Sequence, residues 1–207
     1  MFDELVKFFV VLLVVVEPLS LLPVLAGLTQ GADDSYRRHM SLKAVAISAV
    51  VCIVFALVGA ALLRLLGISV DAFKVGGGIL LFLLAIEMVF ARPSGVRSIT
   101  PGEDQEAHVR GDISVFPLAF PLIAGPGALA TILLAFAGVP YGSPQFFAQL
   151  LIICIVLGIT LALMLVTGPV MRVVGVTGGA VLGRLLGVLL AALAAQFVMD
   201  GIRGAMS

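Results

Sequence analysis

Charged side chains are scarce in this chain of 207 residues: Lys, Arg, Asp and Glu make up only 12% of it. A typical soluble domain has about 25%. The 12 cations and 12 anions cancel, so there is no excess basic charge for binding nucleic acid. Hydrophobic residues make up 61% and the mean hydropathy is +1.24. Because a soluble domain of this size cannot bury so much apolar surface, the composition predicts an integral membrane protein whose surroundings are the lipid bilayer, with no nucleic-acid partner.

Cysteine and histidine are also rare, with two of each. Cys52 and Cys154 fall inside apolar segments and form no C-x-x-C pair, which argues against a thiol relay or a disulfide framework. His39 and His108 lie in hydrophilic segments, so no histidine is available within the membrane for haem, zinc or a Ser-His dyad. The sequence therefore predicts no cofactor, no resident metal and no catalytic residue, and the chain is expected not to be an enzyme.

Six apolar segments are long enough to cross a bilayer, which takes about 20 residues. They cover residues 5–28, 41–66, 71–91, 113–138, 145–170 and 181–203. Between the third and the fourth lies the longest hydrophilic loop, at about 92–112. We therefore expect an all-α integral membrane protein whose single transmembrane domain covers residues 1–207.

Positive charges divide unequally between the two sides that six spans define. The side facing the loops after the first, third and fifth spans carries Arg37, Arg38, Lys43, Arg92, Arg97, Arg110, Arg172 and Arg184. The opposite side carries Lys7, Arg64, Lys74 and Arg203. Because loops rich in Lys and Arg stay in the cytoplasm, this division predicts a multi-pass inner (plasma) membrane protein with both termini on the non-cytoplasmic side.

A second copy of the same pattern begins about 108 residues further along the chain. At this offset Pro18 falls on Pro126, and residues 64–69 (Arg-Leu-Leu-Gly-Ile-Ser) fall on residues 172–177 (Arg-Val-Val-Gly-Val-Thr). Each half contains three spans, an odd number, so the second half must enter the membrane in the opposite direction. We expect two inverted three-helix repeats, with boundaries at about 1–95 and 113–207.

The first and fourth spans are broken near their centres. Pro18 and Pro23 interrupt the first span and Gly125-Pro126-Gly127 the fourth, because proline lacks an amide donor and glycine frees the backbone. Broken helices persist in a membrane only inside protein or beside a wet cavity. Breaks at matched positions predict a substrate site at the midplane, although each could also be a silent proline kink. The predicted substrate-binding residues are Glu17, Pro18, Ser20, Gly125, Pro126, Gly127 and Thr131.

Polar groups inside the spans are few. Glu17 is the only acid at the centre of a span, where a charge costs at least roughly 2.5–3.5 kcal/mol. We predict that it binds a coupling ion, either a proton or sodium; the alternative is a protonated acid that only supports helix packing. Glu87 and Gln196, which the repeat relates with one residue of slip, either add polarity to the same cavity or lie near the interface.

Small residues recur every four positions in the last span, at Gly183, Gly187, Ala191 and Ala195. Such a face lets another helix approach closely. It predicts tight packing either within one chain or between copies in a homo-oligomer.

At these residues the sequence resembles the MarC family of small six-span bacterial and archaeal inner-membrane proteins. Residues 117–127 (Pro-Leu-Ala-Phe-Pro-Leu-Ile-Ala-Gly-Pro-Gly) look like the signature of the family's fourth span, and residues 73–82 and 195–201 are similar to its third and last. The resemblance implies transport of small neutral amino acids such as glycine and alanine, driven by a proton or sodium gradient. In the first span the family usually has Asn or Asp, Pro and then Gly, whereas this chain has Glu17, Pro18 and Ser20.

These observations favour a secondary transporter that works by alternating access. A channel, or an efflux protein for another small solute or a drug, is the alternative. An intramembrane enzyme would need a catalytic constellation that the spans do not contain. A purely structural membrane protein would leave the matched helix breaks unexplained.

Overall fold

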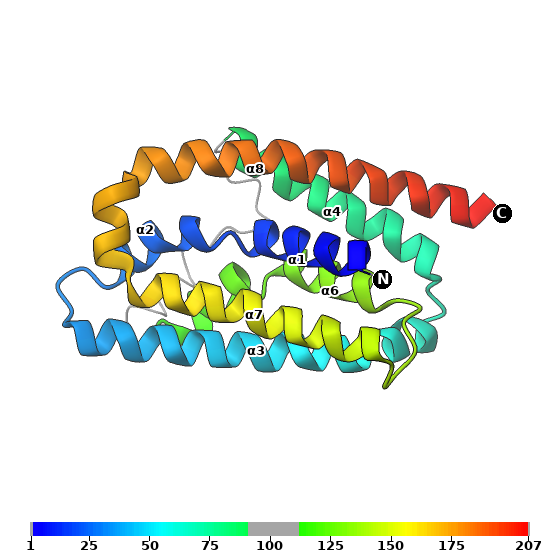
Figure 1. Cartoon of the computed structure of the whole chain (residues 1–207), viewed down its shortest axis with the longest axis horizontal. Coiled ribbons are helices and arrows are strands. Elements are labelled where there is room, and N and C mark those ends of the chain that lie inside the picture. Colours follow the sequence, from blue (N-terminus) through cyan, green and yellow to red (C-terminus); the bar gives the residue numbers. More distant parts are fainter. Residues whose placement is uncertain (1, 91–111, 207) are drawn as a thin grey trace.

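The computed structural model describes residues 2–90 and 112–206, and within these ranges the secondary structure is helical with no strand. The helices are α1 (Phe2–Val16), α2 (Pro18–Leu28), α3 (Asp34–Leu65), α4 (Val70–Phe90), the π-helical segment η1 (Ser114–Ile123), α6 (Pro126–Phe136), α7 (Pro144–Leu165) and α8 (Thr167–Met206). Most of them run along the long axis of the molecule (Figure 1). Helices suit a bilayer because their backbone groups are satisfied within one segment.

The six expected spans correspond to long apolar helices. Five segments are long and apolar enough to cross a membrane: Phe2–Leu28, Asp34–Leu65, Val70–Phe90, Pro144–Leu165 and Val181–Met206. The sixth consists of η1 and α6, which are bent by 54° where they join. The prediction of an all-α integral membrane protein is confirmed.

The boundaries of the last two spans differ from the prediction. We expected a connection between residues 170 and 181, but α8 begins at Thr167 and continues without interruption to Met206. The first part of α8 stands at a steep angle to the rest (Figure 1). The connecting segment contains Arg172, yet its apolar and small residues are compatible with a helix, so the chain turns without leaving helical geometry.

The first span lies at the centre of the bundle. In its most apolar window 61% of the residues are buried inside the protein, against 22–39% in the four spans that consist of one helix each. Around it, α3 lies against α7 and α4 lies against α8, while α1 contacts α6 (Figure 1). The offset of 108 residues relates α3 to α7 and α4 to α8, whereas it relates α1 to η1 and α2 to α6. The inverted repeat itself and its boundaries stay a prediction.

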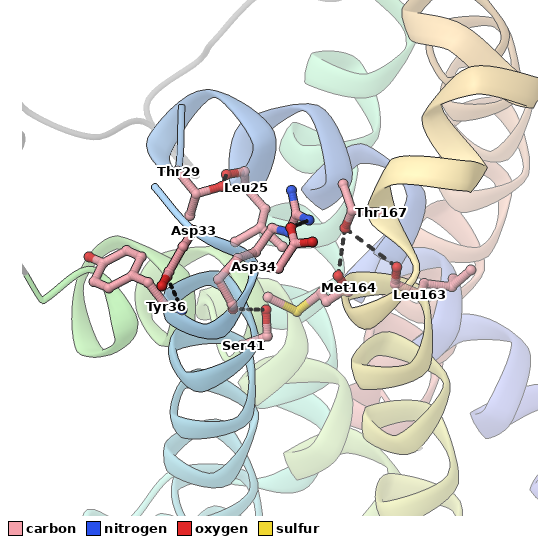
Figure 2. A network of polar contacts seen from close by, with 10 residues as sticks. Leu25, Thr29, Asp33, Asp34, Tyr36, Ser41, Leu163, Met164 and Thr167 are labelled. Carbon is pink, nitrogen blue, oxygen red and sulfur yellow. Dashed lines mark hydrogen bonds and ion pairs between the residues drawn. The ribbon is translucent and has the colours of Figure 1, made fainter. Parts of the chain in front are cut away.

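Side-chain hydroxyls and carboxylates satisfy backbone groups at the helix ends. At the end of α2, the Thr29 hydroxyl donates to the Leu25 carbonyl at 2.7 Å, and the Asp33 carboxylate accepts from the Tyr36 amide at 2.8 Å to begin α3 (Figure 2). Nearby, the Thr167 hydroxyl donates to the Met164 carbonyl at 2.6 Å where α7 passes into α8. Because terminal amides and carbonyls have no partner within the helix, these bonds fix where each helix begins and ends.

Both termini lie toward the same end of the bundle, as an even number of spans requires (Figure 1). Which side of the membrane this end faces stays a prediction. Three of the cations counted for it, Arg92, Arg97 and Arg110, lie outside the described residues, as do His108 and the loop except for Asp112.

Candidate functional site

The first helix break is a sharp turn at Glu17. Its backbone is left-handed, with φ 51° and ψ 60°, and among the described residues no other non-glycine residue has a positive φ. The Glu17 amide still donates to the Leu13 carbonyl at 3.0 Å, so α1 ends there. Pro18 then begins α2 at a position where a missing amide hydrogen costs nothing. A left-handed glutamate costs roughly 1–3 kcal/mol, which is typical of positions that a functional site imposes.

The Glu17 side chain is buried, with 8% of its surface exposed, and lies between α2 and α8. The Ser20 hydroxyl donates to its Oε1 at 2.6 Å. From the other side, the backbone of Gly183 approaches so closely that an added Cβ would lie 2.6 Å from Oε1. Of the predicted residues, the structure therefore joins Glu17, Pro18 and Ser20 in one place.

A cavity of about 230 Å³ adjoins these three residues. Apart from Glu17 and Ser20, it is lined by apolar groups of α1, α2, α7 and α8, which are Leu13, Val14, Pro18, Leu19, Ile159, Leu163, Gly179, Leu182, Gly183 and Leu186. The arrangement places one carboxylate and one hydroxyl in a hydrophobic chamber. Such a chamber suits a small solute with one positive group and an apolar body.

The second break separates η1 from α6. Within η1 the backbone is extended at Phe116 and Phe120, each of which precedes a proline and is thereby pushed away from helical geometry. At the junction itself, a Cβ on Gly125 would lie only 2.1 Å from the Pro121 carbonyl oxygen, so only glycine fits. Pro126 then begins α6, and no side chain caps this helix at Gly125.

The start of α6 is covered by neighbouring side chains. A Cβ on Gly127 would lie 2.9 Å from Leu84 of α4 and 3.1 Å from Val15 of α1. A small cavity of about 10 Å³ adjoins Gly125, Pro126 and Gly127, which is room for one water molecule. Residues of the second break are thus brought close to α1 near the first break, but they line a cavity of their own.

Thr131 lies one turn further along α6 and lines a third cavity. Its side chain is 2% exposed, and its hydroxyl donates to the Gly127 carbonyl at 2.8 Å. The cavity next to it has a volume of about 400 Å³. The predicted substrate-binding residues therefore line three separate cavities. What these residues share is that each lies at or within about one helical turn of a helix break.

Glu87 and Gln196 differ in their surroundings. Glu87 is buried in α4, whereas Gln196 is half-buried in α8 and donates to the Asp200 carboxylate at 2.7 Å. Neither residue lines one of the three cavities described above. A role of these two residues in coupling stays a prediction.

The small face of α8 is used within the chain. Gly183 lies against Glu17, and a Cβ on Gly187 would lie 2.8 Å from the Cβ of Met88 in α4. Ala191 and Ala195 are half-buried. Close packing inside one chain accounts for the two glycines, and a homo-oligomer through this face stays a prediction.

Apart from Thr131, the residues that line the cavity of about 400 Å³ were not predicted to form a site. Glu4 and Lys7 of α1 and Gln145 and Gln149 of α7 line it together with Phe197 of α8. A signal was present, because Gln149 is an amide inside a predicted span. What the sequence did not indicate is that the N-terminal turns of α1 and α7 meet.

The comparison with known families agrees with this architecture. A family model described as MarC family integral membrane protein matches residues 2–206. The chain belongs to the MarC family. The resemblance carried by residues 117–127 is thereby confirmed, and the MarC chain is an integral multi-pass membrane protein.

Relatives from distant organisms match almost end to end. A UPF0056 membrane protein of Methanocaldococcus jannaschii is 34% identical, over 93% of this chain and 92% of its own length. YvbG of Bacillus subtilis is 31% identical, with 99% and 96% covered. The inner membrane protein YhgN of Escherichia coli K12 is also 31% identical, with 97% of each chain covered. The names of these three relatives describe them as membrane proteins and mention no substrate. No solved structure matches the chain.

Proposed function

We propose that this MarC protein is a secondary transporter of small neutral amino acids such as glycine and alanine, which works by alternating access and is coupled to a proton or sodium gradient. The observation that carries the proposal is the pair of half-helices α2 and α6. Both begin at a proline after a break within an apolar span, and a buried carboxylate stands at the start of one of them. Discontinuous helices of this kind form the substrate and ion sites of many transporters.

The start of α6 suits the carboxylate of an amino acid. The first amides of a helix have no partner within it, and the helix dipole adds positive potential there. Glycines at 125 and 127 let a ligand approach the backbone, and no side chain caps Gly125. Since Val15 and Leu84 cover this position, a substrate enters only when α1 and α4 move away from α6. That requirement is the physical content of alternating access here.

Glu17 is the proposed site of the coupling cation. Its carboxylate is buried, accepts a hydrogen bond from Ser20 and lies at a junction that movement of α1 against α2 would alter. A proton or a sodium ion at Glu17 would neutralise a charge that is costly in an apolar environment. The proposal includes no catalytic residue, and the absence of a cofactor and of a resident metal stays a prediction.

The experiment is counterflow of labelled alanine or glycine in proteoliposomes that contain wild type, Glu17→Gln or Asp34→Asn. The last variant is the control, because Asp34 is an exposed carboxylate at the start of α3. We expect saturable exchange in wild type and in Asp34→Asn. In Glu17→Gln we expect that an imposed proton or sodium gradient drives accumulation at least about tenfold less. Absence of saturable exchange with any small amino acid in wild type would exclude the transporter.

The apolar lining of the cavity beside Glu17 favours a second candidate, efflux of a small amphiphilic solute or drug. Leu163, Leu182 and Leu186 offer a hydrophobic body more contact than glycine can use. A competition experiment decides between the two candidates. Efflux would be favoured if an amphiphilic cation blocks the flux of alanine while the alanine flux itself does not saturate with concentration. Flux that is neither saturable nor exchanged would indicate a channel.

A further inference from the structure

A cavity lies at the end of the bundle that carries the termini, one helical turn of α6 from the second break. It has a volume of about 400 Å³, within the roughly 300–1,000 Å³ typical of small-molecule sites. The start of α1, the end of α6 and the start of α7 meet around it, and this end of the bundle is visible beside the N label in Figure 1. A turn at residues 137–140 completes the wall.

The rim of the cavity carries one charge of each sign. Glu4 and Lys7, on successive turns of α1, are both exposed. The Gln145 amide donates to the Glu4 carboxylate at 3.2 Å, and the Lys7 ammonium lies 4.9 Å from the centre of the Phe197 ring. Because these formal charges cancel, the rim favours a dipolar solute of zero net charge over an ion of either sign.

The floor of the cavity offers hydrogen-bond acceptors. Gln149 is 3% exposed; its amide nitrogen donates to the Ala135 carbonyl at 3.0 Å, while its Oε1 accepts no hydrogen bond from the described residues. A buried acceptor left without a donor costs roughly 1–3 kcal/mol, so a ligand that donates to it gains that energy. The Thr131 hydroxyl, which already donates to Gly127, retains acceptor capacity on the same floor.

We propose that this cavity is a second, peripheral site for a zwitterionic amino acid. The ammonium group binds at Gln149 Oε1 and Thr131 Oγ1, and the carboxylate lies toward Lys7. Thr131 is four residues from Gly127, so the site lies one helical turn from the second break and serves as a waiting position for the solute. The choice of an amino acid as ligand rests on the proposed function, whereas the dipolar chemistry of the cavity does not.

A phosphatidylethanolamine headgroup also combines an ammonium with an anionic group, and the cavity is near a membrane surface. The experiment therefore uses purified full-length protein in nanodiscs of phosphatidylcholine alone, where no primary ammonium is present. Equilibrium binding of labelled glycine and alanine is measured for wild type, Gln149→Leu, Lys7→Met and the control Gln30→Leu. Gln30 is an exposed amide between α2 and α3 and lines none of the three cavities described above.

We expect two binding components in wild type and in Gln30→Leu. Gln149→Leu and Lys7→Met should each weaken one component by about tenfold or more, because each loses a hydrogen bond to a charged group. Lys7 is exposed, so Lys7→Met keeps the test valid if Gln149→Leu fails to fold. Glu17→Gln should leave the component that depends on Lys7 unchanged.

Two outcomes overturn the peripheral site. In the first, both cavity variants bind as wild type does; the proposed function still stands if Glu17→Gln alters driven accumulation. In the second, nanodiscs that contain phosphatidylethanolamine abolish the component that depends on Lys7, which shows that the cavity binds lipid. If wild type binds no amino acid and shows no counterflow, the proposed function fails as well.

Discussion

At the level of single residues, the candidate site depends on glycines that let neighbouring groups approach the backbone closely. Gly183 allows α8 to reach the Glu17 carboxylate, and Gly125 allows the chain to pass the Pro121 carbonyl. Both positions are buried. Glu17 itself adopts a left-handed backbone that disfavours most side chains. A buried acid, a strained backbone and close backbone contacts together make the first break the centre of the proposed function.

Gly183→Ala tests this arrangement. The new Cβ would lie 2.6 Å from Glu17 Oε1 and 3.8 Å from Ser20 Oγ, so the carboxylate must move and its bond to Ser20 weakens. We expect a loss of stability of about 1–3 kcal/mol, as for other overpacked sites, and driven accumulation reduced at least about tenfold. Thermal unfolding in detergent and accumulation of labelled alanine in proteoliposomes under an imposed proton or sodium gradient measure the two effects.

The control is Gly158→Ala in α7, where an added Cβ meets no atom within 4 Å. This variant should unfold and transport as wild type does. If Gly183→Ala is as stable and as active as Gly158→Ala, then Glu17 has room to move and its position is not set by α8.

At the level of elements, η1 is the most irregular segment of the described chain, and its start is tied to α3. The Lys43 ammonium of α3 donates to Asp112 at 2.5 Å, and the same carboxylate accepts from the Ser114 amide at 3.0 Å. Irregular backbone at membrane depth persists only when protein surrounds it. Most of η1 is accordingly buried, and Asp112 fixes where it begins.

The stabilisation that the ion pair between Lys43 and Asp112 provides should depend on pH. Hydrogen bonds from Lys43 and Ser114 lower the pKa of Asp112 from 3.8 to about 2. The stabilisation is therefore complete above about pH 4 and is lost as the pH falls toward 2. Because the pair is partly exposed, it contributes at most about 1 kcal/mol. We expect Lys43→Met to lower the unfolding midpoint at neutral pH, and the difference from wild type to shrink in acid.

Arg38→Met is the matched control for this measurement, since Arg38 is an exposed cation on the same helix. It should follow the pH dependence of wild type. A difference between Lys43→Met and wild type that stays constant from neutral pH to about pH 2 would show that Asp112 does not carry the effect.

At the level of the whole molecule, six spans place both termini toward one end of the bundle (Figure 1). The peripheral cavity opens among residues of that same end, including Glu4 and Lys7. The side of the membrane that this end faces therefore decides from which compartment a solute reaches the cavity. The distribution of positive charge predicts the non-cytoplasmic side.

Sided thiol labelling tests the predicted orientation. In a background with Cys52→Ala and Cys154→Ala, single cysteines replace Asp3, Ala32 or Ala205 in turn. An impermeant maleimide added to intact cells should label the first and last positions, and should label position 32 only after lysis. The reverse labelling pattern would show that the orientation in the membrane is opposite to the predicted one. Labelling of positions 3 and 205 from different sides would contradict an even number of spans.

The sequence alone determined the class of the protein and the places where its helices break. Hydropathy and length indicate membrane spans because each span must satisfy its own backbone in lipid. Pro18, Pro126 and Gly125 indicate the breaks because their effect on the backbone is local and needs no partner. Residues 117–127, which include the second break, also carried the resemblance to the MarC family, which the family model confirms over residues 2–206.

Only the tertiary structure decided what surrounds those breaks. That Gly183 lies against Glu17, that Val15 and Leu84 cover Gly127, and that Gln149 lines a cavity with Lys7 are contacts between helices distant in the chain. The helical connection at the start of α8 was also not predicted, because the segment that contains Arg172 was expected to be a loop. Local stereochemistry fixes where a helix ends, whereas a cavity forms only from the side chains that packing brings together.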